Sequence, residues 1–299
     1  MFIIKYKKIF LAIAAILMLA SVAAIALFRL NLGIEYVGGS FLRFSTDQAV
    51  EESVLRERLT AGYDGEYTLQ ADGSGFTLRT ETLSEQERVA MLSTLSGNKP
   101  ELIKVEEFTT IGPTLGSELR SKAIFSIALV VIAITLYIAY AFRHVSAPVS
   151  SWKYGLVIMV SLLHDILITV GVFAVLGHFG GVEIDSLFLS AILVILGYSI
   201  NDTVVVFDRI RENLSNTPEE KRAEDFEQIV GQSLSQTFVR SINTSVTVII
   251  SLIVVYVMTP PAIQQFALAL LVGMISGAYS SLFVASPLLT YFNRPQKEV

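Results

Sequence analysis

Residues 196–213, LGYSINDTVVVFDRIREN, begin as an apolar helix and end as a charged one. Asn201 and Asp202 lie in the apolar part, and Asp202 is about six residues, or roughly 9 Å, from the boundary that Asp208 marks. A short carboxylate side chain cannot span that distance to reach water. It must face a polar partner or water inside a helix bundle, where the default function is ion transfer. The alternative is a structural polar contact between helices.

The composition is that of a membrane protein. The chain has 299 residues, of which 53% are hydrophobic and 16% are charged, whereas about 25% are charged in an average soluble domain. A membrane-spanning helix needs roughly 20 mainly apolar residues. Six stretches qualify: about 9–28, 120–142, 154–176, 187–208, 240–258 and 262–292. The first is predicted to be a retained span rather than a cleaved signal peptide, because its apolar run is long and five more spans follow.

Lysine and arginine residues in the short loops predict the orientation of the spans. They occur in the N-terminal segment, in the loops 143–153 and 209–239, and in the C-terminal tail. The opposite short loops, GHFGGVEID and MTPPAI, contain neither residue type. Both termini are therefore predicted to be cytoplasmic, and the long segment 31–117 is predicted to lie outside.

The outer segment is predicted to be an α+β ferredoxin-like domain. Its order of elements, βαββαβ, is the split-βαβ pattern. Ser45 with Gln48, and Ser84 with Glu87, have the spacing of capping boxes at two helix starts. The turn sequence ADGS separates two strands of an expected hairpin. The chain is thus expected to be a polytopic α-helical membrane protein of six spans with this domain inserted between spans one and two.

The expected domains are 1–30, the first span with its cytoplasmic N-terminus; 31–117, the extracytoplasmic domain; and 118–299, a five-span bundle. A cytoplasmic amphipathic helix is expected near 218–236, because Phe226, Ile229, Val230 and Leu234 form one apolar stripe. In the last span, small residues recur every four positions, which predicts close helix packing in lipid. They are Ala269, Gly273, Gly277 and Ser281.

Two further polar positions lie within spans. Asp165 is halfway along the third span beside His164, but neighbours on a helix point about 100° apart and need not share a site. A helix–helix hydrogen bond is the alternative to an ion site there. Arg240 enters the fifth span, with Thr244 one turn further on. Arg240 can approach Asp202 from the neighbouring antiparallel helix, and such a pair is switched by one proton; the alternative is an arginine that extends to the membrane surface.

The sequence gives no support for an enzyme, a cofactor or a nucleic-acid partner. It has no cysteine and three scattered histidines, so it offers no thiolate or convincing histidine metal site. It contains no phosphate-binding loop, catalytic triad or basic aromatic patch.

The same residues carry a resemblance to the SecD/SecF family of bacterial protein-export membrane proteins. LGYSINDTVVVFDRIREN closely resembles the signature of the SecF subunits, and HD in the third span and RSINTS in the fifth are similar to that family. LGIEYVGGS after the first span and IGPTLGSEL before the second are similar too, although the family's usual GIDF and Gly-Gly-Thr are here GIEY and Gly-Gly-Ser.

The resemblance implies half of a resistance-nodulation-division (RND) transporter architecture in the bacterial inner membrane, with SecD as the other half. The pair would use an H⁺ or Na⁺ gradient to promote translocation of preproteins through the SecYEG channel. The family's ion relay maps onto Asp202, Arg240 and Thr244, and its glycine hinge loop at the outer domain maps onto Gly38 and Gly39. Asn201 and Asp165 are further candidates for the relay.

Two other functions remain open from the sequence. One is a subunit of a small-molecule or lipid exporter of the same superfamily, although such exporters usually have twelve spans and two large outer domains in one chain. The other is a passive assembly subunit, which has no need of a buried carboxylate.

Overall fold

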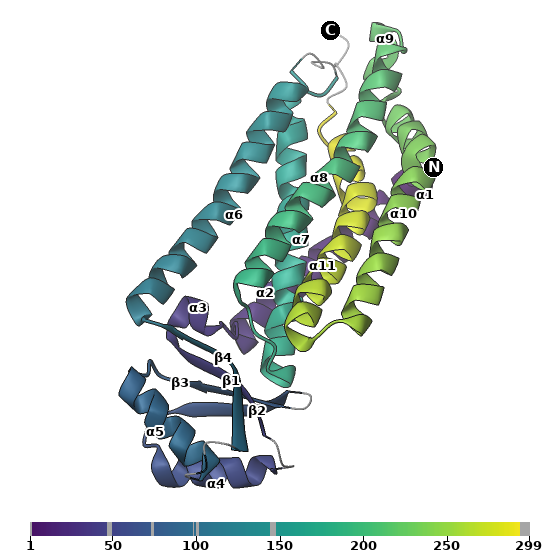
Figure 1. Cartoon of the computed structure of the whole chain (residues 1–299). Coiled ribbons are helices and arrows are strands. Elements are labelled where there is room, and N and C mark those ends of the chain that lie inside the picture. The colour runs from purple at the N-terminus through teal and green to yellow at the C-terminus, as the bar shows by residue number, and fades with distance from the viewer. Residues whose placement is uncertain are drawn as a thin grey trace. The chain divides into compact units, whose positions relative to one another are not determined.

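The computed structural model describes residues 2–46, 50–72, 75–97, 99, 102–143 and 148–293. The chain folds as two compact units (Figure 1). One unit is Leu32–Ile124, and the other combines Met1–Asn31 with Phe125–Val299.

Six helices are long and apolar enough to cross a membrane, which confirms the predicted number of spans. Short helices adjoin them at α1 (Phe2–Lys5), α9 (Glu219–Arg222) and α12 (Ser286–Thr290), and η2 (Ser280–Ala285) is a π-helix. The long helices are α2 (Lys7–Phe28), α6 (Pro113–Ala141), α7 (Ser151–Gly180), α8 (Ser186–Ser215), α10 (Phe226–Met258) and α11 (Pro261–Tyr279), the last continued by η2 and α12 to complete the sixth span.

The amphipathic helix expected near 218–236 is not a separate element. After the four residues of α9, α10 runs without a break from Phe226 to Met258 and so includes the fifth span. The sequence contains no proline between these limits to stop the helix. Its apolar stripe, including Phe226, Val230 and Leu234, is buried in the bundle.

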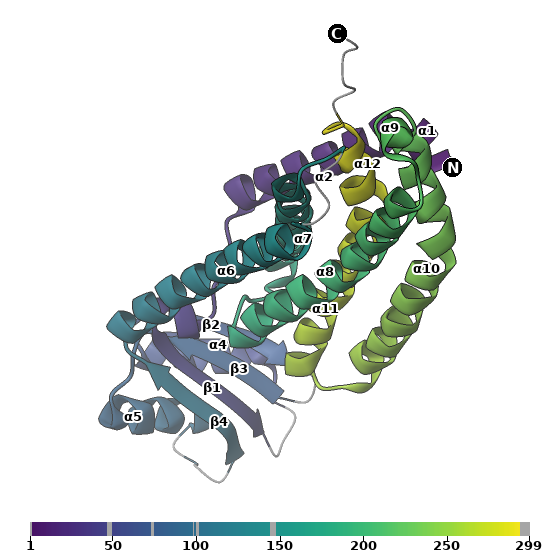
Figure 2. The ribbon, with the colours of Figure 1, turned by 90° about the horizontal axis from the view of Figure 1, so that it is seen from above.

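Small residues bring α11 and η2 close to α8, as the sequence predicted. A Cβ atom added at Gly273 would lie 2.1 Å from Ile195, and one at Gly277 would lie 3.2 Å from the Ser199 Cβ atom. One turn further, Thr203 donates a hydrogen bond of 3.1 Å to Ser281. In both views of the ribbon, α11 lies between α8 and α10 (Figures 1 and 2).

The smaller unit contains the predicted ferredoxin-like fold. Its antiparallel sheet has the strand order β2-β3-β1-β4, with β3 between β1 and β2. The helices α4 (Glu52–Gly62) and α5 (Glu85–Ser96) cover one face of the sheet (Figure 2). The strands are β1 (Gly39–Thr46), β2 (Tyr67–Asp72), β3 (Gly75–Thr80) and β4 (Ile103–Ile111).

Alternating side chains of the strands pack against the two helices to form the core of this unit. Leu42, Phe44, Leu55 and Leu95 belong to this core, and each is at most 4% exposed.

One of the two predicted capping boxes is confirmed. Ser84 accepts a hydrogen bond from the Glu87 backbone, and the Glu87 carboxylate accepts one from the Ser84 backbone at 2.8 Å. The predicted role of Ser45 is wrong, because β1 continues through it and pairs it with Gly75 and Lys104. Its expected partner, Gln48, lies outside the described residues.

Candidate functional site

Asp202 lies on the buried side of α8 and is 7% exposed. Its carboxyl group faces the hydroxyls of Ser241 on α10 and Ser281 on η2. The positive charge of Arg240 attracts the carboxylate more weakly than these hydroxyls do. Within the described part of the chain, its Oδ2 atom and the hydroxyls of Ser241 and Ser245 have no hydrogen-bond partner. Buried polar atoms without partners are rare in folded proteins and require an explanation. These oxygens could accept a proton, a water molecule or a cation.

The other residues expected near Asp202 lie on exposed faces. Asn201 of α8, and Arg240 and Thr244 of α10, are all exposed. The Thr244 hydroxyl donates to the backbone carbonyl of Arg240 at 2.8 Å. Among the described residues, Asp202 and Arg240 do not form a close ion pair. The structure therefore brings Arg240 near Asp202 without the direct contact that the sequence suggested.

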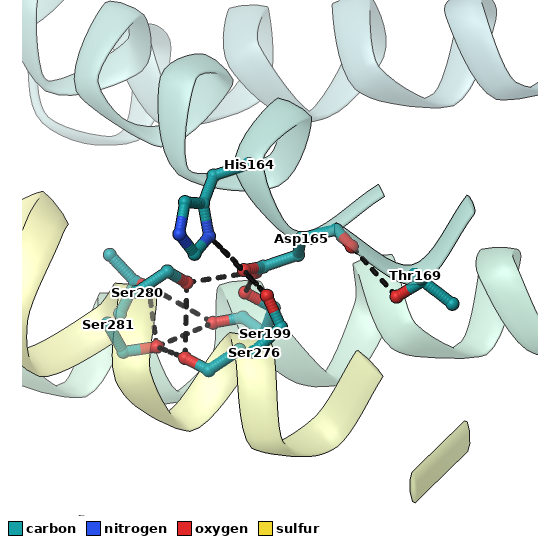
Figure 3. A network of polar contacts seen from close by, with 9 residues as sticks. His164, Asp165, Thr169, Ser199, Ser276, Ser280 and Ser281 are labelled. Atoms are coloured by element: carbon teal, nitrogen blue, oxygen red, sulfur yellow. Dashed lines mark hydrogen bonds and ion pairs between the residues drawn. The ribbon is translucent and has the colours of Figure 1, made fainter. Parts of the chain in front are cut away.

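Asp165 is fully buried at the centre of a hydrogen-bonded cluster (Figure 3). Its Oδ2 atom accepts hydrogen bonds from Ser199 at 2.6 Å and from Ser280 at 2.9 Å. Its Oδ1 atom is 3.0 Å from the Ser276 hydroxyl and 2.9 Å from Nδ1 of His164. From the sequence, the two neighbours did not have to share a site; in the structure their side chains turn toward each other.

The serines around the two carboxyl groups were missed at the level of sequence. Ser199, Ser276 and Ser280 were not singled out, and Ser281 was assigned to packing alone. The available signal was the recurrence of hydroxyl residues in the last apolar span, at 276, 280, 281 and 286. All four of these serines are at most 5% exposed.

Two glycines fix the loop that enters the smaller unit. Gly38 has φ 85° and Gly39 has φ 129°, values that side chains strongly disfavour. A Cβ atom at Gly38 would lie 2.8 Å from Cα of Pro113, and one at Gly39 would lie 2.7 Å from the Thr80 carbonyl oxygen. A Cβ atom added at Gly116 would lie 2.7 Å from the backbone nitrogen of Gly38. The loop therefore needs glycine at both positions.

The site is built from titratable and hydroxyl side chains. Among the described residues, no group of three or more histidine, cysteine, aspartate or glutamate side chains could hold a metal ion. Its functional groups are two buried carboxyls, one buried imidazole and several hydroxyls. Buried carboxyl and histidine groups of this kind form proton relays in membrane transport proteins.

Comparison with known protein families agrees with this architecture. The family described as "Protein export membrane protein SecD/SecF, C-terminal" matches residues 91–295. The protein translocase subunit SecF of Thermobaculum terrenum is 40% identical over 303 residues, which cover 96% of this chain and 92% of that protein. The SecF subunit of Desulfurispirillum indicum is 35% identical and covers 95% of this chain.

The chain also matches part of longer, fused relatives. The protein translocase subunit SecDF of Bacillus subtilis is 32% identical to 94% of this chain, which spans 36% of that protein. The crystal structure of SecDF from Thermus thermophilus, a translocon-associated membrane protein, matches 97% of this chain with a TM-score of 0.80 and 27% identity. This chain spans 38% of the length of that SecDF chain.

The six apolar helices, the inserted antiparallel domain and these relatives agree with one another over nearly the whole sequence. The chain therefore belongs to the SecD/SecF family of protein-export membrane proteins.

Proposed function

We propose that this chain works with a SecD partner to promote translocation of preproteins through and out of the SecYEG channel, driven by the transmembrane ion gradient. Family membership supports a protein translocase subunit. The observation that carries the proposal is the buried Asp202 carboxyl, whose Oδ2 atom has no partner among the described residues. A charged carboxylate in a membrane span costs about 2.5–3.5 kcal/mol, so a purely structural role does not explain it.

In this proposal Asp202 binds and releases the transported ion, H⁺ or Na⁺. Arg240 stabilises the ionised carboxylate at a distance, and Thr244 and Asn201 present polar groups on the adjacent exposed faces. Asp165 is the second buried carboxyl of the site. One charge crossing 100 mV releases about 2.3 kcal/mol, which biases a two-state equilibrium by tens-fold.

The remaining assignments follow from the same proposal. Residues 1–30 form the first span, 31–117 an extracytoplasmic domain and 118–299 the five-span bundle, with the start of α10 and both termini on the cytoplasmic side of the bacterial inner membrane. The outer domain changes position at the Gly38–Gly39 loop. Support for this hinge is the backbone geometry that only glycine adopts comfortably.

A polar stripe on α10 supports a partner within the membrane. Arg240, Asn243, Thr244, Thr247 and Ser251 lie three or four residues apart, and all five are exposed. Residues with this spacing share one face of a helix. Polar side chains in spans rarely face lipid and usually contact another helix or a water-filled cavity. A SecD partner, which the fused SecDF relatives contain in the same chain by name, would cover this stripe.

The central test is Asp202→Asn, which keeps the size and polarity of the side chain but removes its titration. In vesicles containing the SecD complex, we expect gradient-stimulated export to fall by at least about 100-fold, the range that proton-transfer groups contribute. Insertion and SecD binding should be unchanged. The matched control is Asp208→Asn, because Asp208 lies on the same helix but is exposed and paired with Arg211. Full gradient stimulation in Asp202→Asn would make the ion-binding role wrong.

The partner surface can be tested with single cysteines, because the chain has none of its own. A membrane-permeable maleimide should label Thr247→Cys more slowly in the SecD complex than in the isolated subunit. Leu19→Cys is the control, since Leu19 is 69% exposed on the apolar helix α2 and should label equally in both. Equal labelling of Thr247→Cys in the two preparations would show that SecD does not cover the stripe.

A further inference from the structure

The hydrogen bonds around Asp165 satisfy both of its carboxyl oxygen atoms. Among the described residues, they leave the Nε2 atom of the neighbouring His164 without a partner. Ser199, Ser276, Ser280 and His164 surround the carboxyl group from α7, α8, α11 and η2. His164 is 0% exposed, and its Nε2 atom has no partner in the part of the chain that the structure describes. Tyr279 stacks on the imidazole ring at a centroid distance of 6.0 Å.

The charge of this cluster depends on one proton. If His164 is neutral and Asp165 is ionised, the cluster has a net negative charge that is fully buried. With one more proton, held at Nδ1 or at Oδ1 across the 2.9 Å contact, the pair is neutral overall. Moving that proton between the two atoms breaks one bond to hydrogen, forms the other and leaves the net charge unchanged.

The spacing of the oxygen atoms favours a proton over a metal cation. The serine hydroxyls are 2.6–3.0 Å from the Asp165 carboxyl oxygens, which are hydrogen-bonding distances. A cation placed among these atoms would have to break the hydrogen bonds. The imidazole Nδ1 atom also lies at hydrogen-bonding distance from Oδ1 of Asp165, at 2.9 Å.

The π-helix η2 connects this cluster to Asp202. Its first residue, Ser280, donates to Asp165, and its second residue, Ser281, faces Asp202. The two hydroxyls also share one acceptor, the Gly277 carbonyl oxygen, at 3.2 and 2.7 Å. A π-helical turn inside an α-helix frequently marks a functional site. A change of charge at Asp202 that reorients Ser281 therefore changes the hydrogen bonds available to Ser280 and Asp165.

We propose that Asp165 and His164 form a second proton-holding site, and that Ser280 and Ser281 of η2 couple its protonation to that of Asp202. The inference rests on the proposed function, because it takes Asp202 as the first ion site. Beyond the proposed function, the inference assigns a second site at Asp165 and His164, a proton as its ligand, and η2 as the element that links this site to Asp202. The two sites would then load and release protons in a dependent order, so that one gradient-driven cycle moves η2 relative to α8.

Among the described residues, His164 is the one titratable group in the hydrogen-bonded shell of the Asp165 carboxyl. From α8 it meets Ser199, from α11 Ser276, and from η2 Ser280, with His164 from its own helix. These four groups are the polar contacts of the carboxyl among the described residues. His164 is thus the nearest titratable partner, and the hydroxyls adjust to either protonation state.

The first arm of the test compares Asp165→Asn, His164→Asn and Asp202→Asn in liposomes containing the SecD complex. An entrapped pH-sensitive dye reports proton entry, and a protease-protected substrate reports export. Each asparagine can still form hydrogen bonds but cannot carry the proton. We expect Asp165→Asn and His164→Asn to lower gradient-driven proton entry and export by at least about tenfold, with SecD binding and the melting midpoint retained.

The second arm tests the coupling element and does not depend on replacing a buried carboxyl. Ser281→Ala should lower gradient-driven export by about tenfold, as expected for the loss of one hydrogen bond. Ser286→Ala is the control, because Ser286 is also fully buried in the sixth span but only donates a 3.4 Å bond to the Ser281 carbonyl. It should remain within about twofold of the parent chain.

The outcomes separate this inference from the proposed function. If Asp202→Asn loses gradient-driven export while Asp165→Asn and Ser281→Ala keep it, the proposed function stands and the second site is overturned. Asp165 is then a hydrogen bond that holds helices together. A sodium gradient at equal pH that drives export as well as a proton gradient also overturns the second site. If Asp202→Asn retains full gradient stimulation, both proposals fail.

Discussion

Replacing Gly38 by alanine tests the geometry of the loop that precedes the outer domain. Gly38 has φ 85° and ψ 167°, in a region that is essentially restricted to glycine. An alanine there costs about 1–3 kcal/mol in backbone strain. Its Cβ atom would also lie 2.8 and 2.9 Å from backbone atoms of Pro113, which cannot rotate away as a side chain could. Relief of this overlap costs about a further 1–3 kcal/mol.

The two costs together, about 2–6 kcal/mol, correspond to an increase in local opening of roughly 30-fold or more. Hydrogen exchange followed by mass spectrometry measures this directly, because the Gly38 amide donates to Ile34 at 2.8 Å and becomes exchangeable on opening. Gly112→Ala is the matched control, since no atom lies within 4 Å of its added Cβ. Equal exchange in the two variants would refute the steric argument. The distorted loop of Gly38→Ala should also lower gradient-driven export.

Two further predictions concern stability. The hydrogen bonds from Ser84 lower the pKa of the Glu87 carboxyl. The contribution of Glu87 to stability is therefore present above the unfolded-state pKa and is lost as the pH falls through the folded-state pKa. Hydrogen exchange at the start of α5 should therefore increase on acidification, and Glu87→Gln should remove this dependence. In the bundle, Gly273→Ala places a methyl group against Ile195 and should lower the free energy of unfolding by about 1–3 kcal/mol. The added Cβ of Gly197→Ala meets nothing within 4 Å, so this variant should raise it by about 0.5–1 kcal/mol. Thermal unfolding in detergent distinguishes the two variants.

The spans and the outer fold were predictable because their signals are local and repeated. Each span is a continuous apolar run, and hydrophobic burial in lipid allows only a helix there. The βαββαβ order and the Ser84 cap follow from short sequence patterns. The Ser45 cap failed because β1 pairs with neighbouring strands on both sides, at Gly75 and Lys104. A sheet ladder that forms between distant segments overrides a local side-chain preference.

The surroundings of the two carboxyls were not predictable in the same way. Asp202 stands out because it is a charge inside an apolar run. The serines that surround Asp165 come from α8, α11 and η2, which are distant in sequence, and each serine alone is compatible with simple packing. The π-helix at Ser280–Ala285 also changes the helical period, so a pattern of 3.6 residues per turn cannot assign Ser280 and Ser281 to their faces.

The two carboxyls differ in how much of their environment this chain supplies, and the difference bears on the division of work with the partner. Asp165 receives all of its hydrogen bonds from within the bundle. Asp202 keeps an unpaired oxygen among the described residues, and its expected helpers Arg240, Thr244 and Asn201 lie on exposed faces. A charged guanidinium exposed along a span is costly in lipid unless protein or water covers it. The Asp202 site is therefore expected to be complete only when SecD is bound, whereas the Asp165 cluster should form in the isolated subunit.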